Sequence, residues 1–96
     1  MKNPATTEAI SQHWCLVTVK QWKRDSFIRH LEHKLEQKQL SEIILEIIEP
    51  QESVYDNIVI LRVSSYSEAR SILPTIEYFQ SVQRLKQQEV NRMLDR

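Results

Sequence analysis

The chain contains no glycine among its 96 residues, so every turn is made by residues that carry a Cβ atom. The constraint is clearest in residues 46–61, EIIEPQESVYDNIVIL, where a polar linker separates two runs of branched apolar residues. Such runs are typical of strands, and Pro50 ends the first because proline cannot donate to a sheet ladder. Asp56 and Asn57 tolerate turn geometries that otherwise call for glycine. The sequence therefore predicts two strands joined by a short linker that turns at these residues.

The spacing of apolar residues predicts the remaining elements. Runs rich in β-branched and aromatic residues predict strands at 14–19, 43–48, 58–63 and 76–82. A first helix follows the first strand, with Asp25 or Ser26 at its start. Its apolar stripe consists of Phe27, Ile28, Leu31 and Leu35. A capping box at 65–68 predicts a second helix that ends before Pro74.

The order of these elements predicts the fold class. A C-terminal helix from residue 86 places Val90, Met93 and Leu94 on one face, after a β-α-β-β-α-β series. Right-handed crossovers then give an α+β protein, a ferredoxin-like split βαβ sandwich with a four-stranded antiparallel sheet. Two helices cover one sheet face, and the other is open unless something packs on it. We expect residues 1–12 to form a flexible tail and 13–96 one domain.

Composition favours a non-enzymatic protein without cofactors or metals. Thirteen basic and thirteen acidic residues cancel, so the whole chain has no pull toward nucleic acid. The absence of glycine excludes P-loop and dinucleotide fingerprints, and no nucleophile motif is present. A zinc site needs three or four ligands, and Cys15 has no CxxC companion; Glu32 or Glu36 could complete only a fortuitous site beside His30 and His33. A lone Cys15 and no apolar run long enough for a membrane span predict a cytoplasmic protein that does not associate with membranes.

Five segments together resemble the N-terminal (NGN) domain of the NusG transcription elongation factors. They match its opening tryptophan strand, its first-helix apolar positions, its Val-Pro-x-Glu strand end, its apolar-Pro-x-Val-x-Gly-Phe segment and its closing Glu-Val-x-x-(Ile/Met) helix. The segments are residues 14–17, the positions Phe27, Leu31 and Leu35, and residues 49–52, 73–79 and 89–94. Tyr78 stands in the glycine place of the fourth. The chain is interpreted as a stand-alone form without the family's KOW domain.

The resemblance implies a protein that binds RNA polymerase and acts in transcription elongation or antitermination. In the family, an apolar depression of this domain binds the clamp helices of the polymerase. Carried over by position, the depression consists of Trp14, Tyr55, Asn57, Ile76 and Phe79. In this chain the long arm between the second and third strands is deleted, and residues 55–57 replace a Pro-Gly-Tyr turn. These departures support a second hypothesis, a ferredoxin-like adaptor or assembly subunit of another complex that has lost polymerase binding.

Three other surfaces carry further hypotheses. A basic loop with an aromatic residue could contact nucleic acid, although a tryptophan that caps the helix start is the simpler interpretation; the loop residues are Lys20, Trp22, Lys23 and Arg24. The open sheet face could form a homodimer. Residues 42–56 carry five acids and no base, which is typical of a solvated sheet edge and would also complement a basic partner.

Overall fold

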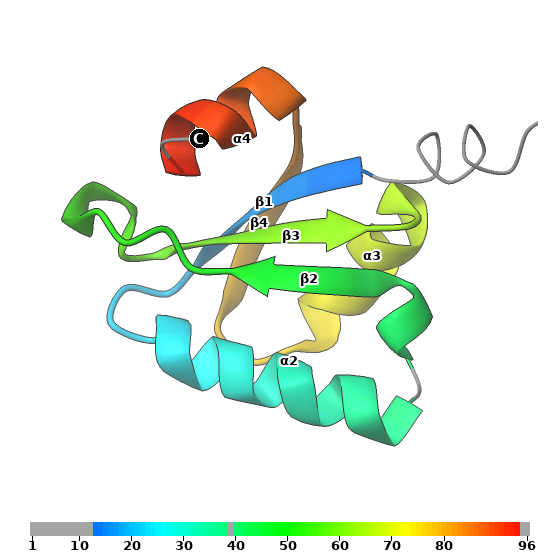
Figure 1. The fold of residues 1–96 in the computed structure, drawn as a ribbon. Coiled ribbons are helices and arrows are strands. Elements are labelled where there is room, and N and C mark those ends of the chain that lie inside the picture. The colour runs from blue at the N-terminus through cyan, green and yellow to red at the C-terminus, as the bar shows by residue number, and fades with distance from the viewer. Residues whose placement is uncertain (1–12, 39, 95–96) are drawn as a thin grey trace, which may run out of the picture.

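The computed structural model describes residues 13–38 and 40–94 (Figure 1). The strands form one four-stranded antiparallel sheet in the order β2-β3-β1-β4. They are β1 (His13–Val19), β2 (Ile44–Ile48), β3 (Ile58–Val63) and β4 (Phe79–Leu85). The helices are α2 (Arg24–Lys38), α3 (Tyr66–Ile72) and α4 (Gln87–Leu94), with 3₁₀ turns at Leu40–Glu42, Ser53–Tyr55 and Leu73–Thr75. The predicted split βαβ sandwich is confirmed; the predicted tail, 1–12, lies outside the described residues.

The main core lies between the sheet and helices α2 and α3. Alternate residues of the two central strands point to this side, since side chains alternate between the faces of a strand. The buried strand residues are Cys15, Val17 and Val19 of β1 and Val59, Leu61 and Val63 of β3. Phe27 and Leu31 of α2 are fully buried against them, as their helical spacing predicts. Burial of each such side chain stabilises the fold by about 1.5–3 kcal/mol.

The Cys15 thiol belongs to this core and is free. Burial raises its pKa to about 11, an effect that the nearby charge of Arg84 only partly offsets. The thiol therefore stays protonated near neutral pH, and a protonated buried thiol is a poor nucleophile. Cys15 acts here as a small apolar residue.

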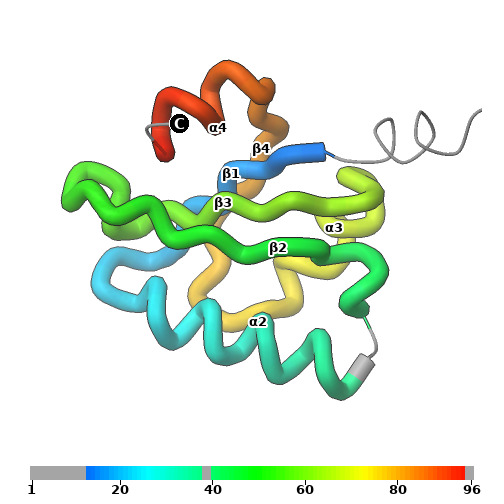
Figure 2. Tube along the Cα trace, in the orientation of Figure 1, coloured from blue at the N-terminus to red at the C-terminus, as the bar shows by residue number. Residues whose placement is uncertain are grey.

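Part of the second face of the sheet is covered by the chain's own C-terminal helix. Ile60 points away from the face that carries Val59 and Leu61, yet it is fully buried. Helix α4 lies over this side, opposite α2 (Figure 2), and its Val90 is also fully buried. The Trp14 indole Nε1 donates to Gln87 Oε1 at the start of α4 over 2.9 Å. The open face expected from the sequence is therefore absent around Ile60, because the amphipathic helix uses that apolar surface itself.

Several predicted boundaries differ from the observed ones. Helix α2 begins at Arg24, so Asp25 lies in its first turn instead of capping it, and the Lys23 carbonyl accepts from the Phe27 N–H. Strand β4 begins at Phe79 because Ile76 is buried at the end of a 3₁₀ turn. The serine half of the predicted capping box of α3 is confirmed, since Ser65 Oγ accepts from the Glu68 N–H over 3.3 Å.

Candidate protein-interaction site

Two bulky residues take the left-handed backbone conformation that glycine would adopt without strain. Among the described residues, the positive φ angles are 70° at Trp22 and 76° at Tyr78. Each residue is third in a turn closed by a hydrogen bond, from the Lys23 N–H to the Lys20 carbonyl in one and from Phe79 to Ile76 in the other. This arrangement is that of a type II turn, in which the third position favours glycine. Such conformations cost about 1–3 kcal/mol each.

The linker between β2 and β3 turns without such strain. Asp56 has a φ of −69° and a ψ of −11°, in the right-handed helical region. Asn57 also has no positive φ. Asp56 and Asn57 form the turn before β3, as predicted, but neither they nor the 3₁₀ turn at Ser53–Tyr55 has a positive φ, so no glycine-like conformation is needed there.

Arg24 holds this linker in place. Its Nη1 lies 2.9 Å from the carbonyl oxygen of Tyr55, 3.0 Å from that of Pro50 and 3.2 Å from that of Ile58. Its Nε lies 3.6 Å from Glu49 Oε1, and the side chain is only 16% exposed. Hydrogen bonds from a charged donor are stronger than neutral ones, so one guanidinium fixes both ends of the linker to the start of α2. Arg24 therefore has a structural role that its place in a basic loop did not indicate.

The two strained turns lie side by side at one end of the sheet. The Lys20 N–H donates to the Tyr78 carbonyl over 2.9 Å. The Tyr78 ring lies 5.4 Å from Lys23 Nζ and 5.9 Å from the ring of His30. These contacts, and partial burial against the core, offset the strain at Tyr78. Trp22 is 81% exposed, so burial does not offset its strain.

Most residues of the predicted depression come together at this end. The Asn57 carbonyl accepts from the Val19 N–H over 3.0 Å, and Phe79 pairs with Val19 from the other side. Tyr55 is half-buried in the linker that Arg24 holds, and Ile76 is buried beneath the second turn. We call the accessible part the turn surface; it consists of Trp22, Tyr55, Asn57, Tyr78 and Phe79.

Trp14 does not belong to the turn surface. It pairs with Arg62 and Leu85 near the other end of β1. Along an extended strand this places it roughly 17 Å from Val19. Its indole is bonded to Gln87, so the tryptophan that opens the resemblance anchors α4 instead of lining the predicted depression.

The predicted nucleic-acid residues are divided by the structure. Lys20 and Trp22 are exposed, and Lys23 lies against the Tyr78 ring. Arg24 donates to backbone carbonyls of the linker. A shallow depression of about 190 Å³ beside Trp22 is lined by Trp22, Arg24, Asp25 and Asp56. Its two carboxyl groups oppose a phosphate backbone, so the local charge favours a protein over a nucleic acid at this position.

Sequence reasoning missed Tyr78 and the strain at Trp22. The signal for Tyr78 was available, because it stands where the resembling family has glycine and the observed φ is one that glycine favours. Nothing in residues 20–23 indicates a left-handed residue.

His30 Nε2 lies 3.5 Å from Glu77 Oε1. Within 13–38 and 40–94 no group of three or more His, Cys, Asp or Glu residues is placed to hold a metal ion.

Glycine substitutions measure the strain of the two turns. We expect Trp22→Gly to raise the free energy of unfolding by about 0.5–1 kcal/mol, because relief of strain exceeds the entropy that glycine adds to the unfolded chain. Tyr78→Gly relieves similar strain but removes a half-buried ring, so we expect a loss of about 1–2 kcal/mol. Urea unfolding of both variants checks this; a Trp22→Gly protein less stable than the parent would contradict the account.

Comparisons with known proteins define the fold class. No protein-family model matches the chain, and no curated protein matches it. Among solved structures it is similar to one described as "Domain interaction in Thermotoga maritima NusG", with a TM-score of 0.75 and 16% sequence identity. The match covers 90% of this chain and 57% of that chain.

The chain therefore has the fold of a NusG N-terminal domain. It spans 57% of the length of the similar chain, so the match concerns the domain and not a whole NusG. None of the helices in the described part is long and apolar enough to cross a membrane.

Proposed function

We propose that this chain is a non-enzymatic protein-binding domain that acts on RNA polymerase as a transcription elongation or antitermination factor. The observation that carries the proposal is the NusG-like fold over 90% of the chain, together with the matching segments of the sequence. The surface that binds the clamp region is the turn surface, where Tyr55 of the linker and Phe79 at the start of β4 offer half-buried aromatic side chains.

The turn surface has properties that suit a protein contact. Aromatic residues are enriched at interaction hot spots, because a rigid ring buries a large area at low entropic cost. Arg24 fixes the linker that carries Tyr55, so little ordering is needed when a partner binds. Strained residues cluster at binding sites, and Trp22 combines strain with the largest exposure among the large apolar side chains.

A second candidate is an adaptor of another complex that has lost polymerase binding. The Tyr78 ring stands where the resembling family has glycine, and it fills the space between Lys23 and His30. A bulky side chain at this position would narrow an apolar depression. Trp14, held by Gln87, is also removed from that depression. These features favour a turn surface that serves a different protein.

Recovery from the native host tests the first candidate. We expect the tagged chain to recover the clamp-bearing subunit of RNA polymerase at low salt, and Tyr55→Ala/Phe79→Ala to lower that recovery at least about tenfold, as hot-spot truncations do. Tyr66→Ala is a matched control, because Tyr66 is also a half-buried aromatic but stacks on Arg84 at 4.5 Å, at the Trp14 end of the sheet.

Circular dichroism must show that all variants are folded at the assay temperature. Absence of the polymerase subunit from the parent eluate would overturn the proposal. If another protein is recovered instead, and its recovery depends on Tyr55 and Phe79, the adaptor is the better description. Equal losses in the Tyr66→Ala control would show that the effect is one of stability.

A further inference from the structure

Within the described residues, the outer edge of β2 is unpaired. In the strand order β2-β3-β1-β4, β2 has β3 as its neighbour on one side and no described strand on the other. An unpaired edge presents backbone N–H and C=O groups that can pair with another chain. The pairing of β2 with β3 shifts register between Ile44 and Glu46, and it is continuous from Glu46 to Ile48. A regular stretch of edge therefore remains beyond the irregularity.

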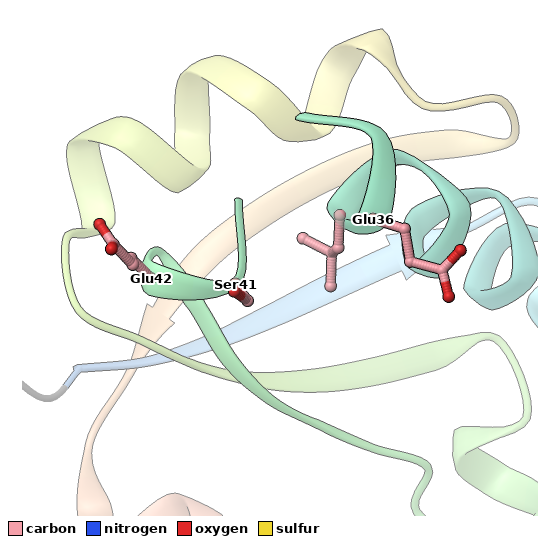
Figure 3. Close-up of a pocket in the computed structure, with 4 residues that line it drawn as sticks. Glu36, Ser41 and Glu42 are labelled. Atoms are coloured by element: carbon pink, nitrogen blue, oxygen red, sulfur yellow. The ribbon is translucent and has the colours of Figure 1, made fainter. Parts of the chain in front are cut away.

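A groove runs along this edge, between β2 and α2. Its volume is about 570 Å³, and it is lined by Glu32, Leu35, Glu36, Ile44, Leu45, Glu46 and Ile47. A second open depression of about 510 Å³ shares Leu35 and Glu36 with it and extends to Ser41 and Glu42 (Figure 3). Leu45, at 38% exposed, is one of the few exposed large apolar residues. An apolar floor thus lies directly beside free backbone groups.

Among the residues that the structure describes, every charged residue that lines the two depressions is a glutamate. Glu46 is paired with Arg62, whose Nε lies 3.0 Å from Glu46 Oε1. Glu32, Glu36 and Glu42 are exposed, and among the described side chains none has an ion-pair partner within 4.0 Å. Figure 3 shows Glu36 and Glu42 on opposite sides of the second depression, with Ser41 between them.

The glutamates that line the two depressions, which we call the rim, determine which kind of partner is favoured. A second copy of this chain paired edge to edge would bring glutamates against glutamates, which is unfavourable. A strand that carries Lys or Arg on one face would instead be attracted to them. Exposed ion pairs contribute only about 0.2–1 kcal/mol each, so the charges set partner choice and association rate while backbone pairing and the apolar floor supply the affinity.

We propose that the groove binds an extended, basic segment of another protein, which pairs with β2 as a fifth strand of the sheet. Alternate residues of that segment point in one direction. Its Lys or Arg side chains lie on the α2 side, where their charged groups reach Glu32 and Glu36 and their aliphatic stems cover Leu35, Leu45 and Ile47. This interface shares no residue with the turn surface, so it is independent of the proposed polymerase contact.

Synthetic peptides test this proposal with the full chain. The probe is a short fluorescent peptide of alternating Lys and Val, and its matched control is a Lys–Pro peptide of the same length and charge, which lacks half of the ladder donors. We expect the Lys–Val peptide to bind, to shift the amide resonances of residues 45–48 and to slow their hydrogen exchange. The Lys–Pro peptide is expected to bind at least about tenfold more weakly.

Charge reversal tests the rim. We expect Glu32→Lys/Glu36→Lys to weaken Lys–Val binding about tenfold. Glu52→Lys/Glu77→Lys, which changes the net charge equally at exposed sites outside the groove, is expected to leave it within about twofold. Equal effects of the two double variants would overturn the proposal, because binding would then follow net charge alone.

Three other outcomes would also overturn it. These are no binding of the Lys–Val peptide up to about 1 mM, equal binding of the Lys–Pro peptide, and resonance shifts confined to residues outside the groove. The peptide comparison uses the unchanged chain, so it is decisive even if a charge variant folds poorly. Loss of polymerase recovery by the turn-surface variant would not affect any of these results.

Discussion

Replacement of Arg24 by alanine is expected to lower the free energy of unfolding by about 2–3 kcal/mol. The Arg24 side chain is 16% exposed, and its Nη1 lies within hydrogen-bond distance of the carbonyl oxygens of Pro50, Tyr55 and Ile58. Without it these oxygens lose a charged donor, and hydrogen bonds to charged groups contribute about 1.5–3 kcal/mol. Urea unfolding followed by circular dichroism measures the loss. We also expect the linker amides of residues 51–57 to exchange faster.

Arg29→Ala is the matched control for this experiment. Arg29 lies on the same helix, is exposed, and its Nη2 makes one long contact of 3.5 Å with Ser26 Oγ. Exposed substitutions of this kind change stability by at most about 0.5 kcal/mol. Arg24→Lys keeps the charge but not the planar array of donors, so we expect it to recover only part of the loss. A loss for Arg24→Ala no larger than that for Arg29→Ala would contradict the role of Arg24.

Val90→Asp is expected to destabilise the protein by about 3 kcal/mol or more. Val90 is fully buried between α4 and the second sheet face, and an unpaired carboxylate there loses its hydration. Release of α4 would also expose Ile60, so we expect the variant to self-associate through the uncovered face. Thermal unfolding measures the first effect, and sedimentation at several concentrations measures the second.

Gln88→Asp provides the control for charge in the same helix. Gln88 is exposed in the first turn of α4, where a carboxylate is favourable beside the helix N-terminus. We expect its stability to stay within about 0.5 kcal/mol of the parent. If Val90→Asp remains monomeric and as stable as Gln88→Asp, α4 does not pack on the sheet around Ile60 in solution.

Arg24 and Val90 fix the positions of two segments, the linker that carries Tyr55 and helix α4. Arg24 holds the short linker between β2 and β3 in place through contacts with three carbonyl oxygens. Helix α4 covers the part of the second sheet face around Ile60. The turn surface at one end of the sheet and the acidic groove along β2 are both accessible, and they share no residue.

The element order was predictable because it depends on local patterns. The stripe of Phe27 and Leu31 and the cap at Ser65 each act within a few residues of chain, and their effects on local structure are the same in any fold. Apolar runs such as residues 58–63 predict the strands. The rule that strand–helix–strand crossovers are right-handed then gives the order of the strands in the sheet. Boundaries that depend on tertiary burial were less accurate, as the start of β4 after Ile76 shows.

The candidate site was predicted only in part. Asn57 and Phe79 come together because each bonds or pairs with Val19, an arrangement that the resemblance anticipated. Trp14 was placed in the same depression, but its indole reaches Gln87 of α4, far away in sequence. Nothing in the sequence near Trp14 shows which side of the sheet α4 will cover.

The sequence by itself determined the set of strands and helices, and the need to turn without glycine. Only the tertiary structure decided which residues adopt the positive φ that glycine would favour. They are Trp22 and Tyr78, whose neighbouring strands fix the turn geometry, and not Asp56 and Asn57. The reason is that a backbone conformation costing about 1–3 kcal/mol persists where packing and hydrogen bonds from distant residues over-determine it. Such contacts form only once the chain has folded. The same holds for the hydrogen bonds of Arg24 to the linker and for the packing of α4 on the sheet.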